Sequence, residues 1–337
     1  PMFFLIDQHF SLSYEEILEN INTSDSYTDC YIYPDLKSFF LNWIFALVNE
    51  KNIALMDSDL SEKEINDNNL TVNQFVKIDN PKKVYSVEEL VNSIQNSNSE
   101  ITLFTSGTTG FTRKFTHPLK NLIRKINVSD ERKNDVWGFA FNPTHVAGVQ
   151  VFFQAILNQN LLVNVFMESK DFVINAINEY KITNLSSTPT FYRLLLPLNQ
   201  SFDSVTKITI GGEKSDNYLI SQVEKYFPNA RINNVYGSTE TGPLFSSQND
   251  EFIVQDKHIG LVKVVDDELY IHKNLFGKTS QLNLIDDFYA TGDLIEWLDD
   301  EQRRFRFTSR KNELINVGGY KVNPYEVEDE LTQHPKI

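Results

Sequence analysis

The residues best suited to chemistry lie in a short stretch, in which the six residues from Thr105 to Gly110 are two glycines and four hydroxyl side chains. An apolar run, Ile101 to Phe104, precedes this stretch and predicts a buried strand, and two cations, Arg113 and Lys114, follow it. Glycine allows a tight turn and lets phosphate oxygens approach main-chain N–H groups, while hydroxyls and cations add further donors. The stretch therefore predicts a polyphosphate-binding loop, with an ordinary polar hairpin turn as the alternative.

A second stretch, Asn234 to Gly242, places an aromatic ring, a glycine, hydroxyls and a carboxylate just after an expected strand, Arg231 to Val235. The ring of Tyr236 can stack on a base, and the Thr239 hydroxyl can bond a phosphate. Glu240 can hold Mg²⁺, because this hard cation prefers oxygen ligands. A plain junction between a strand and a loop is the alternative.

Both stretches resemble motifs of the adenylate-forming superfamily, which includes acyl-CoA synthetases, nonribosomal-peptide adenylation domains and luciferases. The family loop reads Thr/Ser-Ser-Gly-Thr/Ser-Thr-Gly-x-Pro-Lys, and Thr105 to Gly110 match it at every position. Thr112 replaces the family proline, and Arg113 falls on the family lysine with Lys114 beside it. The second stretch matches Asn-x-Tyr-Gly-x-Thr-Glu at every defined position. The segments His-Val-Ala-Gly-Val and Ser-Thr-Pro-Thr are most similar to the o-succinylbenzoate–CoA ligase and aryl/acyl-CoA ligase branches.

Three shorter segments extend the resemblance. Tyr289 to Asp293 match Tyr-x-Thr-Gly-Asp, although Thr-Gly-Asp is also a common turn. Ser309 to Asn312 fall on the Gly-Arg-x-Asp hinge, with its Gly and Asp replaced, and the glycine loop Gly318 to Val322 resembles the one that lines the thioester-forming site. His145 lies in a segment like His-x-x-Gly, although a lone histidine is more often structural than catalytic.

The resemblance implies a role for each candidate residue. Asn234 and Tyr236 would contact adenine, Asp293 and Arg310 the ribose, and Glu240 would be the magnesium ligand. His145 would lie beside the acyl pocket and its entrance. The candidate catalytic residues are Thr239, Glu240, His145 and Arg113. The candidate nucleotide-binding residues are Thr105, Ser106, Gly107, Thr108, Thr109, Gly110, Lys114, Gly212, Glu213, Asn234, Tyr236, Gly237, Asp293 and Arg310.

The middle of the chain alternates apolar strands with amphipathic helices, which predicts an α/β fold with a mainly parallel sheet covered by helices. Ligands in such sheets gather at the carboxyl ends of the strands, so the loops at 105–110, 211–213 and 236–240 could share one crevice. Short strand-like segments from about 250 to 308 predict a small antiparallel barrel or sheet. We expect a large ATP- and acyl-binding domain over 1–309, then a hinge and the start of an incomplete α+β domain over 310–337.

Composition excludes several other functions. The chain has 337 residues and a net charge of −15, which argues against nucleic-acid binding and against docking on anionic membranes. No apolar run is long enough to span a membrane, and the apolar start at Met2 to Ile6 lacks the basic residues of a signal peptide. The single cysteine, Cys30, cannot form an internal disulfide and favours the cytoplasm.

The resemblance implies that the protein uses ATP and Mg²⁺ to convert a small carboxylic acid into an acyl-adenylate. The acyl group would then pass to coenzyme A or to the phosphopantetheine of an acyl carrier protein. The family's adenylation lysine lies beyond the glycine loop and has no counterpart here, so we expect either a fragment or a short protein that works with a separate C-terminal domain. The alternative function is a weakened nucleotide- or acyl-binding module that serves a partner.

Overall fold

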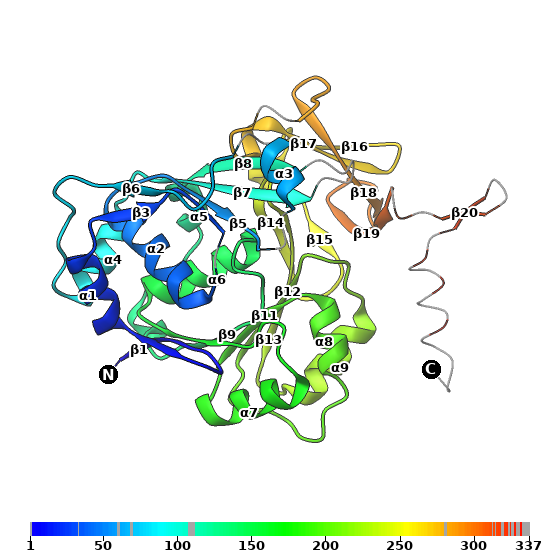
Figure 1. The fold of residues 1–337 in the computed structure, drawn as a ribbon. Helices are drawn as coiled ribbons and strands as arrows, with labels where there is room; N and C mark the ends of the chain where they lie inside the picture. The colour runs from blue at the N-terminus through cyan, green and yellow to red at the C-terminus, as the bar shows by residue number, and fades with distance from the viewer. Residues whose placement is uncertain are drawn as a thin grey trace.

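The structure, a computed structural model, is organised around one large sheet covered by helices on both faces (Figure 1). It describes residues 2–32, 34–58, 61–67, 70–106, 112–279, 282–311, 313, 315–317, 320–322, 324, 327 and 331. The remaining residues include Gly107, Thr108, Thr109, Gly110, Asn312, Gly318 and Gly319, so those candidates lie outside the described residues.

The large sheet has the strand order β14-β13-β12-β11-β9-β10-β1-β2. The neighbours from β13 to β1 pair in parallel, whereas the edge strands β14 and β2 are antiparallel. This arrangement confirms the predicted α/β class. The strands are β1 (Phe3–Ile6), β2 (Ser11–Ser13), β9 (Val136–Phe139), β10 (Leu161–Asn164), β11 (Asn184–Ser187), β12 (Lys207–Gly211), β13 (Arg231–Ser238) and β14 (Gly242–Ser247).

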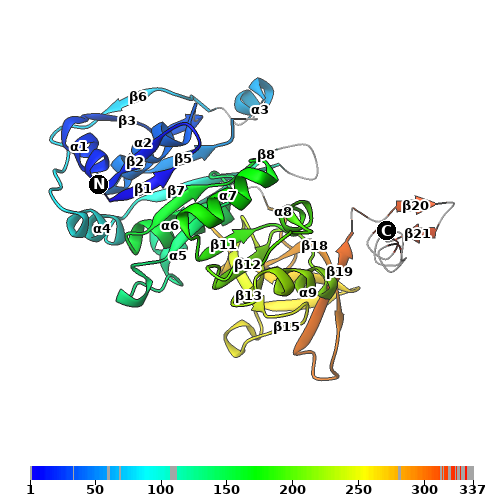
Figure 2. The same ribbon diagram turned by 90° about the horizontal axis from the view of Figure 1, so that it is seen from below.

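Two groups of helices bury the two faces of this sheet. One group packs with the aromatic core around Trp43 and Phe152, and the other packs against Ile208 and Ile210 of β12. Figure 1 shows α7 and α9 on the opposite side of the sheet from α2 and α6, and Figure 2 shows the same molecule from below. The first group is α1 (Tyr14–Thr23), α2 (Leu36–Val48), α4 (Val87–Gln95) and α6 (Val146–Leu157), and the second is α7 (Lys170–Tyr180), α8 (Pro189–Leu195) and α9 (Asn217–Tyr226).

A second sheet carries the expected phosphate loop. Its order is β4-β5-β7-β8, and β7 and β8 form an antiparallel hairpin in which Ser106 pairs with Thr112. Residues 107–111, between these two strands, lie outside the described residues, so the phosphate-loop interpretation stays a prediction. The strands are β4 (Cys30–Ile32), β5 (Ile53–Met56), β7 (Glu100–Ser106) and β8 (Thr112–Pro118); the nearby elements are α3 (Glu62–Asp67), α5 (Leu119–Ile123), and the paired strands β3 (Ser26–Thr28) and β6 (Phe75–Lys77).

A third sheet is antiparallel throughout and confirms the change of pattern expected after residue 250. Its order is β15-β19-β18-β17-β16, and Phe245 of β14 packs into its core. The boundary predicted at residues 309 and 310 stays a prediction. The strands are β15 (Phe252–Ile253), β16 (Val262–Val265), β17 (Glu268–His272), β18 (Phe288–Trp297) and β19 (Arg304–Arg310), and the short hairpin β20 (Ile315–Val317) and β21 (Tyr320–Val322) follows.

Among the described residues, no helix is both long and apolar enough to cross a bilayer.

Candidate active site

One carboxylate joins three strands from two sheets. Asp293 of β18 accepts a 2.6 Å hydrogen bond from the Tyr236 hydroxyl of β13 and a second, also 2.6 Å, from Nε of Arg310 on β19. Asp293 is only 7% exposed. Burial raises the pKa of Tyr236 well above its usual value, and Asp293 raises it further, so the phenol stays a donor. An ionised carboxylate oxygen can accept two hydrogen bonds, so Asp293, with one side-chain donor on each oxygen, can accept from further hydroxyls.

The buried Glu268, which lies outside every motif found in the sequence, holds the backbone next to Asp293. Gly292 has a φ of +80°, a conformation that favours glycine, and its N–H donates to Oε1 of the buried Glu268 over 2.9 Å. The other carboxylate oxygen of Glu268 accepts from the Lys311 ammonium, also over 2.9 Å. Glu268 therefore holds Gly292, the residue before Asp293, and Lys311, the residue after Arg310. Sequence reasoning misses Glu268, because its partners become neighbours only through strand pairing.

A cavity beside Tyr236 is lined by half of the predicted nucleotide-binding residues, seven of the fourteen. The Tyr236 ring stacks on Phe307, with ring centroids 4.2 Å apart. The next residue, Gly237, allows β14 to approach β13 closely, because an added Cβ would lie 2.7 Å from the Gly242 carbonyl oxygen. The cavity is lined by Gly212, Glu213, Asn234, Tyr236, Gly237, Asp293 and Arg310, together with residues not predicted, among them Lys214, Asp250, Phe252 and Phe307.

Two of these lining residues are already engaged within the protein. The Asn234 side-chain amide donates to the Asn249 carbonyl over 2.9 Å, and Asn234 is only 4% exposed. Oε2 of Glu213 accepts from the N–H and the hydroxyl of Thr190. Both residues therefore shape the wall of the cavity, and their direct contact with a nucleotide stays a prediction.

The turn between β13 and β14 lies against the strand that follows the phosphate loop. Nε2 of His117 on β8 donates to the Thr239 carbonyl over 2.8 Å, and the Gly277 N–H donates to the Glu240 carbonyl over 2.9 Å. Burial lowers the pKa of His117, although the Thr239 carbonyl and Glu240 act in the other direction. The predicted catalytic turn is thus held beside β8. The described residues contain no cluster of three or more potential metal ligands, but Mg²⁺ needs only one or two carboxylates when phosphates complete its shell. Glu240 fits that donor set.

Arg113 points towards the antiparallel sheet. Its Nη1 donates to the Tyr289 hydroxyl over 3.1 Å, and Arg113, Tyr289, Gly292 and Arg310 line a cavity of about 500 Å³. Because Arg310 also lines the cavity beside Tyr236, the two spaces adjoin. The other described loop candidates lie on the hairpin: Thr105 and Ser106 end β7, and the exposed Lys114 pairs with Phe104.

A third cavity, of about 480 Å³, lies between α6 and the large sheet, and we refer to it as the acid cavity. It shares Gly212, Val235 and Gly237 with the cavity beside Tyr236, so the two spaces meet at the carboxyl ends of β12 and β13. His145 stands at the N-cap of α6, with its side chain 60% exposed and Nε2 3.7 Å from Oδ2 of Asp57. The residues lining the acid cavity include Val146 and Ala147, the two that follow His145.

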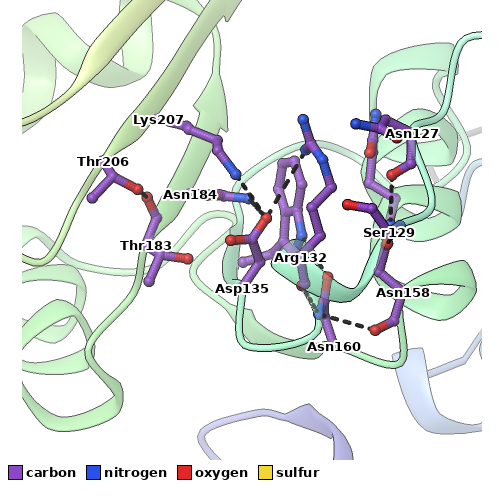
Figure 3. Close-up of polar contacts among 12 residues, drawn as sticks. Asn127, Ser129, Arg132, Asp135, Asn158, Asn160, Thr183, Asn184, Thr206 and Lys207 are labelled. Carbon is purple, nitrogen blue, oxygen red and sulfur yellow. Dashed lines mark hydrogen bonds and ion pairs between the residues drawn. The ribbon is translucent and has the colours of Figure 1, made fainter.

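A polar network lies at the amino ends of β9, β11 and β12, beyond the acid cavity (Figure 3). Asp135 accepts from the Asn184 amide over 3.1 Å and from the Lys207 ammonium over 2.9 Å. Trp137, which lines the cavity, donates from its indole to Oδ1 of Asn160 over 3.3 Å. The network therefore fixes the position of the Trp137 ring in the lining of the cavity.

The chain is similar to known proteins in sequence and in fold. The family model described as "AMP-binding enzyme" matches residues 45–279. A 2-succinylbenzoate–CoA ligase from Staphylococcus epidermidis is 27% identical over 67% of this chain and 52% of its own length, and the one from Bacillus subtilis is 25% identical over 84% and 63%. The chain thus spans about half to two thirds of these relatives.

A solved structure shares the fold over nearly the whole chain. The O-succinylbenzoate coenzyme A synthetase of Bacillus subtilis, in complex with AMP, has a TM-score of 0.70 at 17% identity and covers 99% of this chain and 81% of its own. Since the family model matches more than half of the residues, the chain belongs to the AMP-binding enzyme family.

Proposed function

We propose that the complete protein uses ATP to activate a carboxylic acid as an acyl-adenylate and releases pyrophosphate. The thiol of coenzyme A or of a carrier-protein phosphopantetheine then takes the acyl group, and AMP leaves. The observation that carries this proposal is the junction of two cavities at Gly212, Val235 and Gly237. One cavity holds Tyr236, Asp293 and Arg310, which suit a nucleoside, and the other is large enough for an organic acid.

Each part of ATP has a matching group in this arrangement. Adenine would lie beside the Tyr236 ring, and the ribose hydroxyls would donate to Asp293. The polyphosphate would extend towards Arg113, across the adjoining cavity from Arg310. Arginine suits this position because its planar guanidinium binds phosphate oxygens through two donors.

The reaction would occur where the two cavities meet. A carboxylate oxygen attacks the α-phosphorus, the new P–O bond forms, and the bond to the pyrophosphate oxygen breaks. Negative charge develops on the phosphoryl oxygens, and fixed cationic donors such as Arg113 stabilise it. Mg²⁺, held by Glu240 and the phosphates, would neutralise part of the same charge.

The comparisons support an acid–thiol ligase, since both matched relatives are named as CoA ligases. We also propose a carrier protein as the alternative acceptor and the cytoplasm as the location of the protein. A nucleotide-binding module with weakened turnover is the second candidate. It is favoured by Thr112 and Ser309, which replace the proline of the family loop and the glycine of the family hinge.

Isothermal titration of the chain with Mg·ATP, with AMP and with a non-hydrolysable acyl-adenylate analogue tests the proposal. We expect AMP and the analogue to bind, with the analogue tighter because it fills both cavities. If none of the three binds to folded protein, the proposal is wrong. Carboxylate-dependent exchange of pyrophosphate into ATP then separates the two candidates, since a binding module would show none.

A further inference from the structure

The acid cavity has an unusually polar floor. Ser186, Thr209 and Asn233 lie side by side in register on β11, β12 and β13, so their side chains share the face that lines the cavity. On the other face, the neighbouring residues Ile208 and Ile210 belong to an apolar core. Parallel strands buried on both faces are ordinarily hydrophobic throughout. Packing alone therefore does not explain two hydroxyls and a carboxamide in this row.

The wall opposite the floor is polar too. Gln150 and Gln154 lie one turn apart on α6, on the same side of the helix, and both line the cavity. Nε2 of Gln150 donates to the Leu122 carbonyl over 2.8 Å, which leaves its own carbonyl oxygen available to accept. Oε1 of Gln154 is buried and has no hydrogen-bond partner among the described residues.

Two cations complete the lining. Lys125 and Lys257 both border the acid cavity, and neither forms an ion pair with a carboxylate of the described part of the chain. The Lys125 ammonium donates to the Pro243 carbonyl over 2.6 Å. Burial, followed by the nearby Lys257 and Arg124, lowers the pKa of Lys125 to about 8. The described residues that line the cavity include no carboxylate, so an oxygen-rich group bound there would give these cations an acceptor beyond the Pro243 carbonyl.

We infer that the acid cavity selects a carboxylic acid whose body carries hydroxyl, carbonyl or further carboxyl groups, in preference to an unsubstituted alkyl or aryl acid. The inference rests on the proposed function, whose substrate class it names. An apolar acid would displace water and leave the polar row without partners, which costs about 1–3 kcal/mol for each buried group. Sites that hydrogen-bond a substrate hydroxyl reject analogues lacking it for this reason.

Matched acyl-adenylate analogues test this preference without requiring turnover. The probes are N-acylsulfamoyl adenosines that carry a phenylpropanoyl, a dihydroxyphenylpropanoyl or a carboxyphenylpropanoyl group, and their dissociation constants are measured by isothermal titration. We expect the tighter of the two polar probes to bind about tenfold more strongly than the unsubstituted one, as two added hydrogen bonds predict.

Substitutions then link the preference to the polar row. Thr209→Val keeps the shape of the side chain but removes its hydroxyl, and should reduce the preference about fivefold, which corresponds to one lost hydrogen bond. Thr206→Val is the matched control, because Thr206 precedes β12, is exposed and is not part of the cavity lining. It should leave all three dissociation constants unchanged.

The outcomes are separable. If the unsubstituted probe binds as tightly as both polar probes, the inference is wrong while the proposed function stands. The inference is also wrong if Thr209→Val keeps the full preference. If neither AMP nor any probe binds, the proposed function fails, and the inference fails with it.

Discussion

The 2.6 Å hydrogen bond from the Tyr236 hydroxyl to Asp293 joins the large sheet to the antiparallel sheet. It brings together two motifs that are 57 residues apart in the sequence and places both on the wall of one cavity. Arg310 bonds the other oxygen of Asp293, so the carboxylate has a fixed orientation before any ligand arrives. A carboxylate positioned in this way loses little freedom when it accepts ribose hydroxyls.

Asp293→Asn should weaken AMP binding. The change removes the negative charge that accepts from Tyr236 and Arg310, and hydrogen bonds to a charged group contribute about 1.5–3 kcal/mol, or roughly 10- to 150-fold in affinity. Isothermal titration measures the loss. Asp287→Asn is the control, because Asp287 pairs with Lys273 at the surface and should leave AMP affinity unchanged. Equal affinity of Asp293→Asn and the unaltered protein would remove Asp293 from the nucleotide site.

Gly237→Ala should disturb both stability and nucleotide binding. The added Cβ would lie 2.7 Å from the Gly242 carbonyl oxygen and 2.9 Å from Cα of Pro243, so β13 and β14 must separate. Overpacking of this kind costs about 1–3 kcal/mol. Gly260→Ala provides the comparison: its Cβ meets open space, but its φ of +76° should cost about 1 kcal/mol.

Chemical denaturation and AMP titration read out the two glycine variants. We expect both variants to lose stability and only Gly237→Ala to lose AMP affinity. Normal AMP binding by Gly237→Ala would show that the spacing of β13 and β14 does not shape the site.

Asp135→Ala should destabilise the protein by about 1–3 kcal/mol, because the Asn184 amide and the Lys207 ammonium both lose the acceptor shown in Figure 3. The control is Asp130→Ala, since Asp130 is 92% exposed where it pairs with Lys133. Exposed pairs of this kind contribute little, so that change should leave the stability almost unchanged. Urea denaturation measures both values. Equal destabilisation by the two substitutions would contradict the account of the network.

Cys30 should react slowly with a disulfide reagent such as dithionitrobenzoate while the protein is folded. Burial raises the pKa of this thiol to about 11, and the thiolate is the reactive form. The reaction rate should therefore rise with pH up to about 11, whereas protein unfolded in guanidinium should react at the rate of an ordinary thiol.

Because the folded state disfavours the Cys30 thiolate, the free energy of unfolding should fall as pH rises from the ordinary thiol pKa towards 11. Cys30→Ser is the control and should show no reaction with the reagent. Prompt reaction of the folded, unaltered protein at about pH 8 would contradict the burial of the thiol.

The sequence predicts those features that depend on neighbouring residues. The carboxyl ends of strands β11, β12 and β13 can be located from the proline or glycine residues at or near them, and Tyr236 is found because its whole motif is contiguous. The sequence does not predict strand β18, since Thr-Gly-Asp is typical of a turn. Gly292 instead occupies a left-handed conformation inside the strand.

Features that depend on pairing between distant strands cannot be read from the sequence. The row formed by Ser186, Thr209 and Asn233 needs the register of three strands, and each residue alone is unremarkable. Glu268 needs the pairing of β17 with β18. The partner of Arg310 likewise depends on the pairing of β19 with β18, which places Arg310 opposite Asp293.

A crystal structure of this chain with AMP tests the central claim most directly. The account predicts adenine beside the Tyr236 ring and the ribose hydroxyls within about 3.2 Å of the Asp293 carboxylate, with the phosphate directed towards Arg113. AMP bound elsewhere, or bound with its ribose away from Asp293, would contradict the account.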